Sequence, residues 1–207
     1  MKRNVEMMEI QIDDTHKKER IQSVVAMPSL MLLQSKSYKA YKSIDSLAQP
    51  MGDTPLQLVN RNYNSSSNVS QLLDTVQGSI SILLFFNPIV SREWLQWFND
   101  HYYKITTHYR AHIIGVTAYT AESEWNFPVI NDDKAKIASH FSLADPCGGG
   151  AYPLNALIVF SPTGTNALQL HMPAVHNVAY RDRWKDATNI QQSVVGCLDY
   201  LASSPLI

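Results

Sequence analysis

Cys147 and Cys197 are the side chains of this 207-residue sequence that are best suited to covalent chemistry. A cysteine reacts as its thiolate, and nearby cationic side chains favour that form by lowering the pKa of the thiol. Cys147 stands in the segment DPCGGGAYP, where no Lys, Arg or His lies within five residues. Two interpretations stay open: a relocated redox thiol in a flexible glycine-rich loop, or a loop cysteine without special activation.

Cys197 falls at the edge of the apolar face of a predicted C-terminal helix, which favours a buried core thiol over a resolving cysteine. Neither cysteine belongs to a C-x-x-C motif, and two cysteines are too few for a disulfide scaffold. The sequence leaves a Cys147–Cys197 disulfide open. This cysteine usage fits a reducing compartment, so we expect a cytoplasmic protein.

Other kinds of chemistry find little support in the sequence. The seven histidines are scattered and form no H-E-x-x-H motif, so we expect no metal site. No G-x-S-x-G motif is present, and the glycines at 148–150 lack the Lys-Ser/Thr of a phosphate-binding loop. A net charge of −1 argues against a nucleic-acid-binding surface, and no apolar run approaches the roughly 20 residues that cross a bilayer. We therefore expect no cofactor, no nucleic-acid partner and no membrane insertion.

Three apolar runs rich in β-branched and aromatic residues predict central strands that are buried on both faces. A shorter strand is predicted at PLQLV, and the turn SPTG predicts a hairpin between the third run and a further strand. The predicted strands are SISILLFF (79–86), AHIIGVTAY (111–119), LNALIVFS (154–161) and, in the hairpin, TNALQLHM (165–172).

Helical spacing of apolar residues predicts one long amphipathic helix from Ser91 to Tyr109. A short helix capped by Asn68 or Ser70 is predicted to run through Val76, and the segment RNYNSSSN before it is predicted to be a loop. Two further helices are predicted at 132–141 and at 183–202.

Residues 1–54 are predicted to be an N-terminal extension of a single domain that spans residues 55–207. The extension contains an apolar run, 24–33, and ends in turn-forming residues. This run should pack either on its own domain or on another chain, and we expect residues 23–41 to act as a docking arm. The candidate contact residues of this arm are Leu30, Leu32, Leu33, Tyr38 and Tyr41.

From residue 55 the predicted order is β, short α, β, long α, β, α, β-hairpin, α. Alternation of strands and helices predicts an α/β fold with a mainly parallel sheet, right-handed crossovers and antiparallel strands at one side. Helices should cover both faces of this mixed sheet. Such an arrangement is thioredoxin-like.

Over residues 55–202 the sequence resembles the peroxiredoxin (AhpC/TSA) family. LLFFNP resembles the strand of that family that ends in an aromatic pair and a proline, and HIIGVTAYT resembles its next strand. FPVINDDKAKIASHFSL resembles the family's FPllsDpdgkvAkaYGv segment. LNALIVFSPTG and YRDRWKDATNIQQSVVGCLDYL complete the likeness in the family's order. The resemblance implies a peroxiredoxin-like form of the thioredoxin-like fold.

The family's catalytic turn has the pattern P-x-x-x-T/S-x-x-C, in which a thiolate at the start of a helix attacks peroxide. Counted from Pro88 without a gap, Arg92 takes the Thr position and Leu95 takes the Cys position. A one-residue gap places Ser91 at the Thr position and Trp94 at the Cys position. Neither leucine nor tryptophan can form a thiolate.

The family's arginine before the hairpin strand aligns with Asn155. The resemblance therefore implies that the nucleophile and at least one of its partners are absent together, and we expect ordinary peroxiredoxin catalysis not to operate. Pro153 stands near the position where thioredoxins place a cis-proline that faces the active site, and either isomer is open here.

Trp97 and Tyr103 fall outside the central arc of the long helix's apolar face. They are either interface residues, as exposed aromatic side chains often are, or ordinary surface residues. The resemblance implies that they lie on an edge of the fold where several peroxiredoxins form dimers.

These observations lead to the hypothesis of a catalytically inactive peroxiredoxin-like protein. It would act as a structural or interaction subunit through protein–protein contacts, in a homo-oligomer or a larger complex. Two alternatives stay open. One is a divergent thiol oxidoreductase that uses Cys147, with Cys197 as a resolving partner, and the other is a small-molecule binder that uses the vacated pocket.

Overall fold

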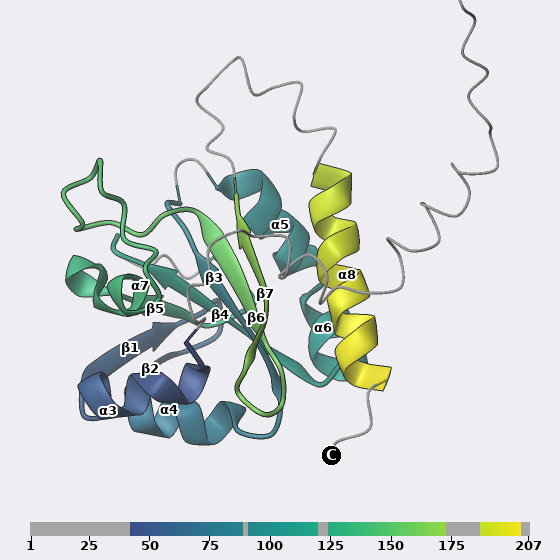
Figure 1. Cartoon of the computed structure of the whole chain (residues 1–207), viewed down its shortest axis with the longest axis horizontal. Helices are drawn as coiled ribbons and strands as arrows, with labels where there is room; N and C mark the ends of the chain where they lie inside the picture. The colour runs from purple at the N-terminus through teal and green to yellow at the C-terminus, as the bar shows by residue number, and fades with distance from the viewer. Residues whose placement is uncertain (1–41, 89–90, 120–123, 173–186, 204–207) are drawn as a thin grey trace, which may run out of the picture.

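A seven-stranded mixed sheet lies between two layers of helices in the computed structural model, which describes residues 42–88, 91–119, 124–172 and 187–203 (Figure 1). The strand order is β2-β1-β5-β4-β3-β6-β7. The central strand β3 (Ile80–Phe85) pairs in parallel with β4 (Ala111–Thr117) and antiparallel with β6 (Ala156–Phe160). This arrangement confirms the predicted mixed sheet with helices on both faces. The sheet is not mainly parallel as predicted, because only the β3–β4 and β4–β5 pairs are parallel and antiparallel pairs lie at both sides.

The predicted strands are all present. Every residue of β3 and β6 is buried, as expected for strands that are covered on both faces. The predicted hairpin joins β6 antiparallel to β7 (Asn166–His171), and β1 (Pro55–Val59) occupies the predicted PLQLV segment.

Two strands were not predicted. β2 (Asn64–Asn68) lies in the segment that the sequence predicts as a loop, and it pairs antiparallel with the whole of β1. It is an edge strand with an exposed, polar surface, so it lacks the apolar alternation by which strands are recognised. β5 (Val129–Asn131) pairs with β1 and β4 but has only three residues, too few for a periodic pattern.

The predicted long helix is wrong as a single element, because the chain forms α5 (Arg92–Asp100) and α6 (Tyr102–His108) with a break at His101. The His101 ring stacks on Trp97, and its Nδ1 lies 2.8 Å from the Trp97 carbonyl oxygen. A side chain that competes for a carbonyl of the helical ladder is a recognised cause of a kink. The apolar face survives the break, since Phe98, Ile105 and Tyr109 are all buried.

The remaining helices follow the predictions closely. α4 (Val69–Val76) begins at the predicted cap, where the Asn68 side chain accepts a hydrogen bond from the backbone N–H of Gln71. The predicted helix at 132–141 is a 3₁₀ turn, η2 (Asp133–Ala135), followed by α7 (Lys136–His140). The last helix, α8, spans Ala187–Ser203, and residues 183–186 of the predicted helix lie outside the described residues.

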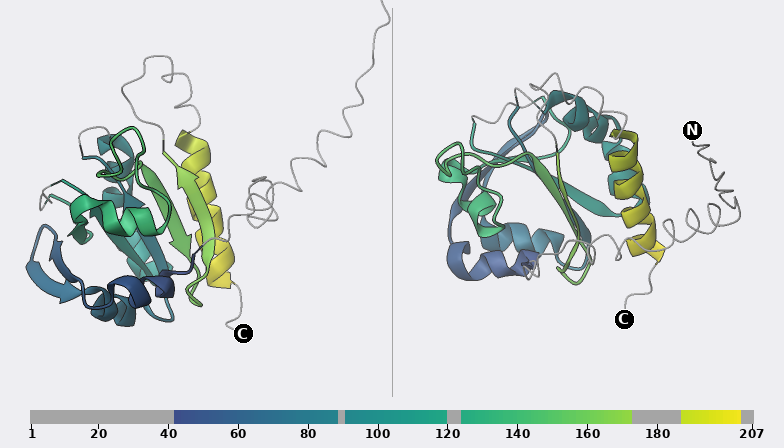
Figure 2. Two further views of the ribbon diagram at one scale, coloured as in Figure 1. Left: turned by 60° about the vertical axis from the view of Figure 1, so that its left-hand side comes forward. Right: turned by 45° about the horizontal axis from the view of Figure 1, so that its top comes forward.

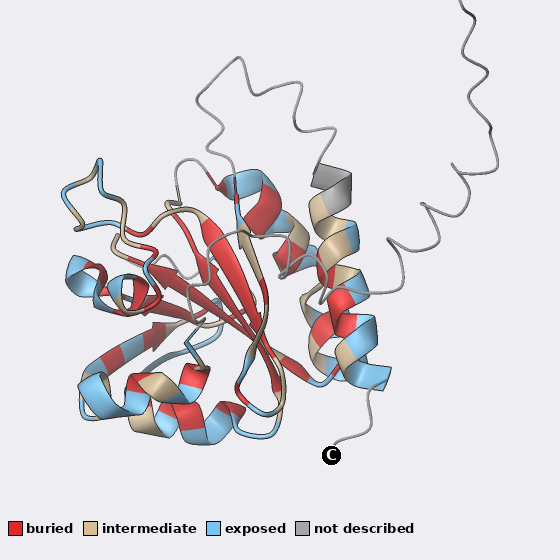
Figure 3. Cartoon of the chain, in the orientation of Figure 1, coloured by how far each residue is buried: buried red, intermediate tan, exposed pale blue. Residues whose placement is uncertain are grey.

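Each face of the sheet carries its own hydrophobic core (Figures 2 and 3). One core packs η1 (Ile44–Leu47), α3 (Ala48–Met51), α4 and α7 against the sheet, and the other packs α5, α6 and α8. Because side chains alternate along a strand, neighbours such as Leu83 and Leu84 of β3 enter opposite cores.

The end of the predicted extension, residues 42–54, packs on the domain. Ile44 and Leu47 are buried in the first core, and the Ile44 N–H donates to the carbonyl oxygen of Gly164 at 2.9 Å. Gly164 has φ of +76°, a conformation suited to glycine, in the turn between β6 and β7. The proposed docking arm precedes this anchored segment and lies outside the described residues.

A hydrogen bond from His140 joins α7 to the anchored segment. The Ser46 hydroxyl donates to the carbonyl oxygen of Ser43 at 2.6 Å, so its oxygen must accept from the His140 Nε2–H at 2.8 Å. Burial lowers the pKa of His140 below its ordinary value, and the charge of Lys42 lowers it further. The folded protein therefore favours neutral His140, whereas the unfolded chain takes up a proton at a higher pH.

We predict that His140→Gln reduces the loss of stability on acidification. As the pH falls through the ordinary histidine value of 6.5, the unfolded state gains the proton first, so the wild-type protein loses stability there. The introduced glutamine keeps an N–H donor but does not titrate, and Lys42→Gln should act in the same direction by removing the nearby charge. Urea midpoints between about pH 7.5 and pH 5.5 measure this effect. An equal loss in the wild-type protein and His140→Gln would contradict it.

Candidate functional site

The turn between β3 and α5 has the strand–turn–helix form that the sequence predicts. Phe86 continues beyond β3 and donates its N–H to Val116 O at 3.1 Å. The Ser91 N–H then donates to Asn87 O at 3.1 Å, and the Leu95 N–H donates to Ser91 O at the same distance. The turn therefore places Ser91 at the start of α5, beside the ends of the central strands.

Asn155 closes this turn from the loop before β6. Its Oδ1 accepts the backbone N–H of Asn87 at 2.9 Å and the hydroxyl of Ser91 at 2.8 Å. Its backbone oxygen accepts the N–H of Met172 at 2.7 Å, which joins the loop to the end of β7. Ser91 is completely buried. The structure thus brings together Ser91 and Asn155, two positions that the sequence analysis assigned to one site from segments 64 residues apart.

The other turn residues do not face this network. The Arg92 side chain is 74% exposed and lies 3.4 Å from the carboxylate of Glu124, which is also exposed to solvent. Trp94 and Leu95 point into the core, and Leu95 is completely buried. The groups that meet at the turn are therefore amide and hydroxyl groups, which can hydrogen-bond but offer neither a nucleophilic sulfur nor a positive charge.

The two cysteines are both free thiols, so the disulfide that the sequence left open is not formed. Cys147 is exposed in the loop before β6, and its backbone N–H donates to the Asp145 carboxylate at 2.9 Å. Cys197 is buried in the second core, and burial raises the pKa of its thiol to about 11. Cys197 is thus a core thiol, one of the two interpretations drawn from the sequence.

A cavity of about 470 Å³ lies beside the Asn155 network and includes Asn155, Asn87 and Pro153 in its lining. Tyr119 and Tyr152, whose rings stack with centroids 5.3 Å apart, form part of its wall, and Tyr119 accepts a hydrogen bond from the Asn87 side chain at 2.9 Å. The peptide bond before Pro153 is trans. The small-molecule hypothesis concerns this cavity and stays a prediction.

The sequence analysis did not single out Tyr119 or Tyr152. They come from the end of the β4 segment and from the glycine-rich loop, 33 positions apart, so no local spacing signals that they meet. What they share is their place in the chain: Tyr119 follows β4, and Tyr152 precedes β6, whose first residue pairs with Phe85 at the end of β3.

The predicted contact residues Trp97 and Tyr103 lie in different surroundings. Trp97 is half-buried on α5, whereas Tyr103 is 65% exposed at the start of α6. Tyr103 makes an edge-to-face contact with Tyr102, and Tyr63 is near enough to contribute to the pKa of Tyr102. Burial, with Tyr63 and Tyr103 nearby, raises the pKa of Tyr102. We refer to Tyr63, Tyr102 and Tyr103 as the tyrosine patch.

The docking-arm residues Leu30, Leu32, Leu33, Tyr38 and Tyr41 lie outside the described residues. Among the residues that the structure does describe, no three His, Cys, Asp or Glu side chains come close enough together to hold a metal ion. Within the same ranges, every helix is too short or too polar to span a membrane.

Comparison with known proteins identifies the fold. Neither a protein-family model nor a curated protein matches the chain. Among solved structures, a cysteine-to-serine mutant of PrxQ from Xylella fastidiosa is similar with a TM-score of 0.53 and 13% identity, over 78% of this chain and 99% of that one. The mitochondrial 2-Cys peroxiredoxin of Plasmodium falciparum (TM-score 0.48, 16% identity) is matched over 65% of this chain and 89% of its own. AhpC of Enterococcus faecalis (TM-score 0.47, 14% identity) is matched over 66% and 87%.

The likeness to PrxQ covers nearly all of that protein and rests on structure, because the sequences share few residues. It shows that this chain has the thioredoxin-like fold in the form found in peroxiredoxins, which confirms the fold class predicted from the sequence. At this level of identity the likeness concerns the fold and leaves the activity to be argued from the site.

We predict that Asn155→Ala destabilises the protein by about 2–3 kcal/mol, because it leaves the Asn87 N–H and the buried Ser91 hydroxyl without their acceptor. Asn155→Asp keeps an acceptor oxygen at this position and should lose less stability. Urea unfolding at neutral pH measures both changes. A loss below about 0.5 kcal/mol in Asn155→Ala would show that the network does not hold the turn.

Proposed function

We propose that this chain is a catalytically inactive peroxiredoxin-like protein that acts as an interaction subunit through contacts with another protein. The partner is either a second copy of the chain or a member of a larger complex. The observation that carries the proposal is the Asn155 network, in which uncharged hydrogen-bonding groups fill the turn at which a peroxiredoxin needs a reactive thiolate.

Peroxide reduction by a thiol requires a sulfur atom that attacks the O–O bond and becomes a sulfenic acid. At the start of α5 both candidate positions hold buried residues without such an atom, Trp94 and Leu95. Cys197 does not replace them, because a buried thiol with a raised pKa is a poor nucleophile. The peroxidatic cysteine of the family therefore has no counterpart at this turn, which supports an inactive site.

The tyrosine patch supports the role in protein contacts. Tyr63 and Tyr103 are 47% and 65% exposed, Tyr103 meets the Tyr102 ring edge-on, and Tyr63 is near enough to raise the pKa of Tyr102. Tyrosine is enriched at protein interfaces because it offers a large apolar area together with a hydroxyl group. We propose this patch as one contact surface and the arm with Leu30, Leu32, Leu33, Tyr38 and Tyr41 as a second.

We predict that the double variant Tyr63→Ser, Tyr103→Ser weakens association without unfolding the domain, because both side chains are exposed. Size-exclusion chromatography with light scattering on the full chain measures the mass against the 23.3 kDa of one protomer. Tyr200→Ser is the matched control, since it changes a tyrosine of similar exposure on α8, 50%, outside the patch. Two results together would count against the proposal. The wild-type chain would be monomeric at every concentration, and it would carry no bound protein that the double variant fails to bind.

We predict that the wild-type protein and Cys147→Ser consume hydrogen peroxide and reduce a disulfide substrate equally slowly. Cys147 is exposed, its backbone N–H donates to a carboxylate, and no Lys, Arg or His lies within five residues of it to favour the reactive thiolate. Coupled peroxidase and insulin-reduction assays provide the measurement. If the wild-type protein turns over and Cys147→Ser does not, the chain is a thiol oxidoreductase and the proposal is wrong.

A further inference from the structure

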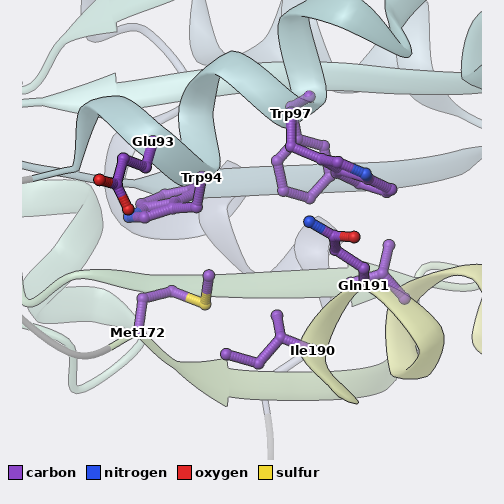
Figure 4. Close-up of a pocket in the computed structure, with 8 residues that line it drawn as sticks. Glu93, Trp94, Trp97, Met172, Ile190 and Gln191 are labelled. Carbon is purple, nitrogen blue, oxygen red and sulfur yellow. The ribbon is translucent and has the colours of Figure 1, made fainter. Parts of the chain in front are cut away.

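A slot of about 180 Å³ separates α5 from α8 (Figure 4). It shares Met172 with the cavity beside the Asn155 network, but none of the other residues that line that cavity. We refer to it as the α5–α8 slot. Three aromatic side chains of α5, Trp94, Trp97 and Phe98, form one wall.

The opposite wall of the slot is aliphatic. Ile190 of α8 and the thioether of Met172 face the aromatic rings (Figure 4), and Val194 of α8 also lines the slot. Among the described residues that line the slot, Glu93 and Gln191 are the polar ones, and Glu93 is exposed to solvent. The slot is therefore an apolar space with few polar groups, which is the usual character of a small-molecule site.

The aromatic wall is held firmly by neighbouring rings. Trp94 makes edge-to-face contacts with Phe86 and Phe98, whose ring centroids lie 6.5 and 6.2 Å away. Trp97 stacks on His101 at 4.6 Å and meets Phe98 edge-on at 4.8 Å. A wall that is fixed before binding avoids the cost of ordering it when a ligand enters.

One polar atom of this wall has no partner. Trp94 is only 5% exposed, and its indole Nε1–H donates to no acceptor among the described residues. In Figure 4 the indole nitrogen lies at the Glu93 end of the slot, above Met172. Buried donors are nearly always satisfied, and this N–H has almost no accessible surface in the ligand-free protein. A bound molecule can supply its acceptor once a neighbouring side chain, such as the exposed Glu93, moves aside.

We propose that the α5–α8 slot binds a small uncharged aromatic or alicyclic compound whose carbonyl oxygen accepts the hydrogen bond of the Trp94 indole. The size fits one ring, because a cavity of about 150 Å³ lined by apolar side chains holds benzene. A carboxylate ligand is disfavoured, since the negative charge of Glu93 lies at the same end of the slot as the indole nitrogen. This inference does not depend on the proposed role in protein contacts.

Titration of the full-length ¹⁵N-labelled protein tests the proposal through the indole N–H signals of its tryptophans. Acetophenone carries a ring and a carbonyl oxygen, and isopropylbenzene has nearly the same shape without an acceptor. We expect acetophenone to move the Trp94 indole proton downfield and to bind about five- to tenfold more tightly than isopropylbenzene, the value of one hydrogen bond. Equal affinities, or an unmoved Trp94 signal, would overturn the proposal.

Variants assign the effect to the slot. Trp94→Phe removes the donor but keeps an aromatic ring, and it should bind acetophenone about five- to tenfold more weakly. Trp125→Phe is the matched control, because Trp125 is equally buried in the same core, at 4% exposure, but does not line the slot. Ile190→Phe should fill the slot and abolish binding of both compounds. Unchanged binding in Trp94→Phe and in Ile190→Phe would place the ligand elsewhere and overturn the proposal.

The preference for an uncharged ligand has its own test. Benzoate should bind more weakly than acetophenone. Glu93→Gln should improve the binding of benzoate and leave that of acetophenone unchanged. Equal binding of the two compounds to the wild-type protein would overturn this part of the proposal. The ligand-free protein supplies a last control. If its Trp94 indole proton already resonates downfield and moves upfield in Glu93→Ala, Glu93 is the acceptor and the orphan donor does not exist.

Discussion

Burial of β3 on both faces is the constraint from which the rest of this structure follows. Six consecutive residues with no exposed side chain, Ile80–Phe85, require a neighbouring strand on each side and a helical layer above and below. The parallel partner β4 is reached through the helices α5 and α6, which cover one face. The antiparallel partner β6 follows α7, which covers the other face together with η1, α3 and α4. The α5 turn lies at the end of β3 for the same reason, because the chain must leave the sheet there to form a covering helix.

Asn155 holds the α5 turn in place through uncharged hydrogen bonds. Two donors, a backbone N–H and a buried hydroxyl, converge on one amide oxygen, and the same residue ties the turn to the end of β7 through its backbone. An arginine at this position would offer only donors, whereas the Asn87 backbone N–H needs an acceptor. The geometry of the turn is thus maintained by a neutral side chain that an arginine could not replace without rearrangement.

Most of the fold could be predicted because its signals are local. The apolar runs of β3, β4 and β6 and the Asn68 cap of α4 each stand in a few adjacent residues. The failures come from contacts that apolar periodicity does not mark. β2 is a strand because β1 pairs with it, and the break at His101 coincides with the stacking of its ring on Trp97, one helical turn earlier. In the site, the resemblance placed Ser91, with a one-residue gap, and Asn155 at two positions of one catalytic site, and the two side chains do meet. The stacking of Tyr119 on Tyr152 depends on the tertiary fold and has no such signal.

The composition of β2 has a consequence for how this protein can associate. One edge of this strand pairs with β1, and all its side chains, in the sequence NSSSN, are short and polar. A short strand with no apolar side chain gives a foreign strand little to pack against, which protects a sheet against open-ended growth. Extension of the sheet into fibres or disordered aggregates is therefore discouraged at this edge, and a concentrated solution of the protein has one less route to precipitation.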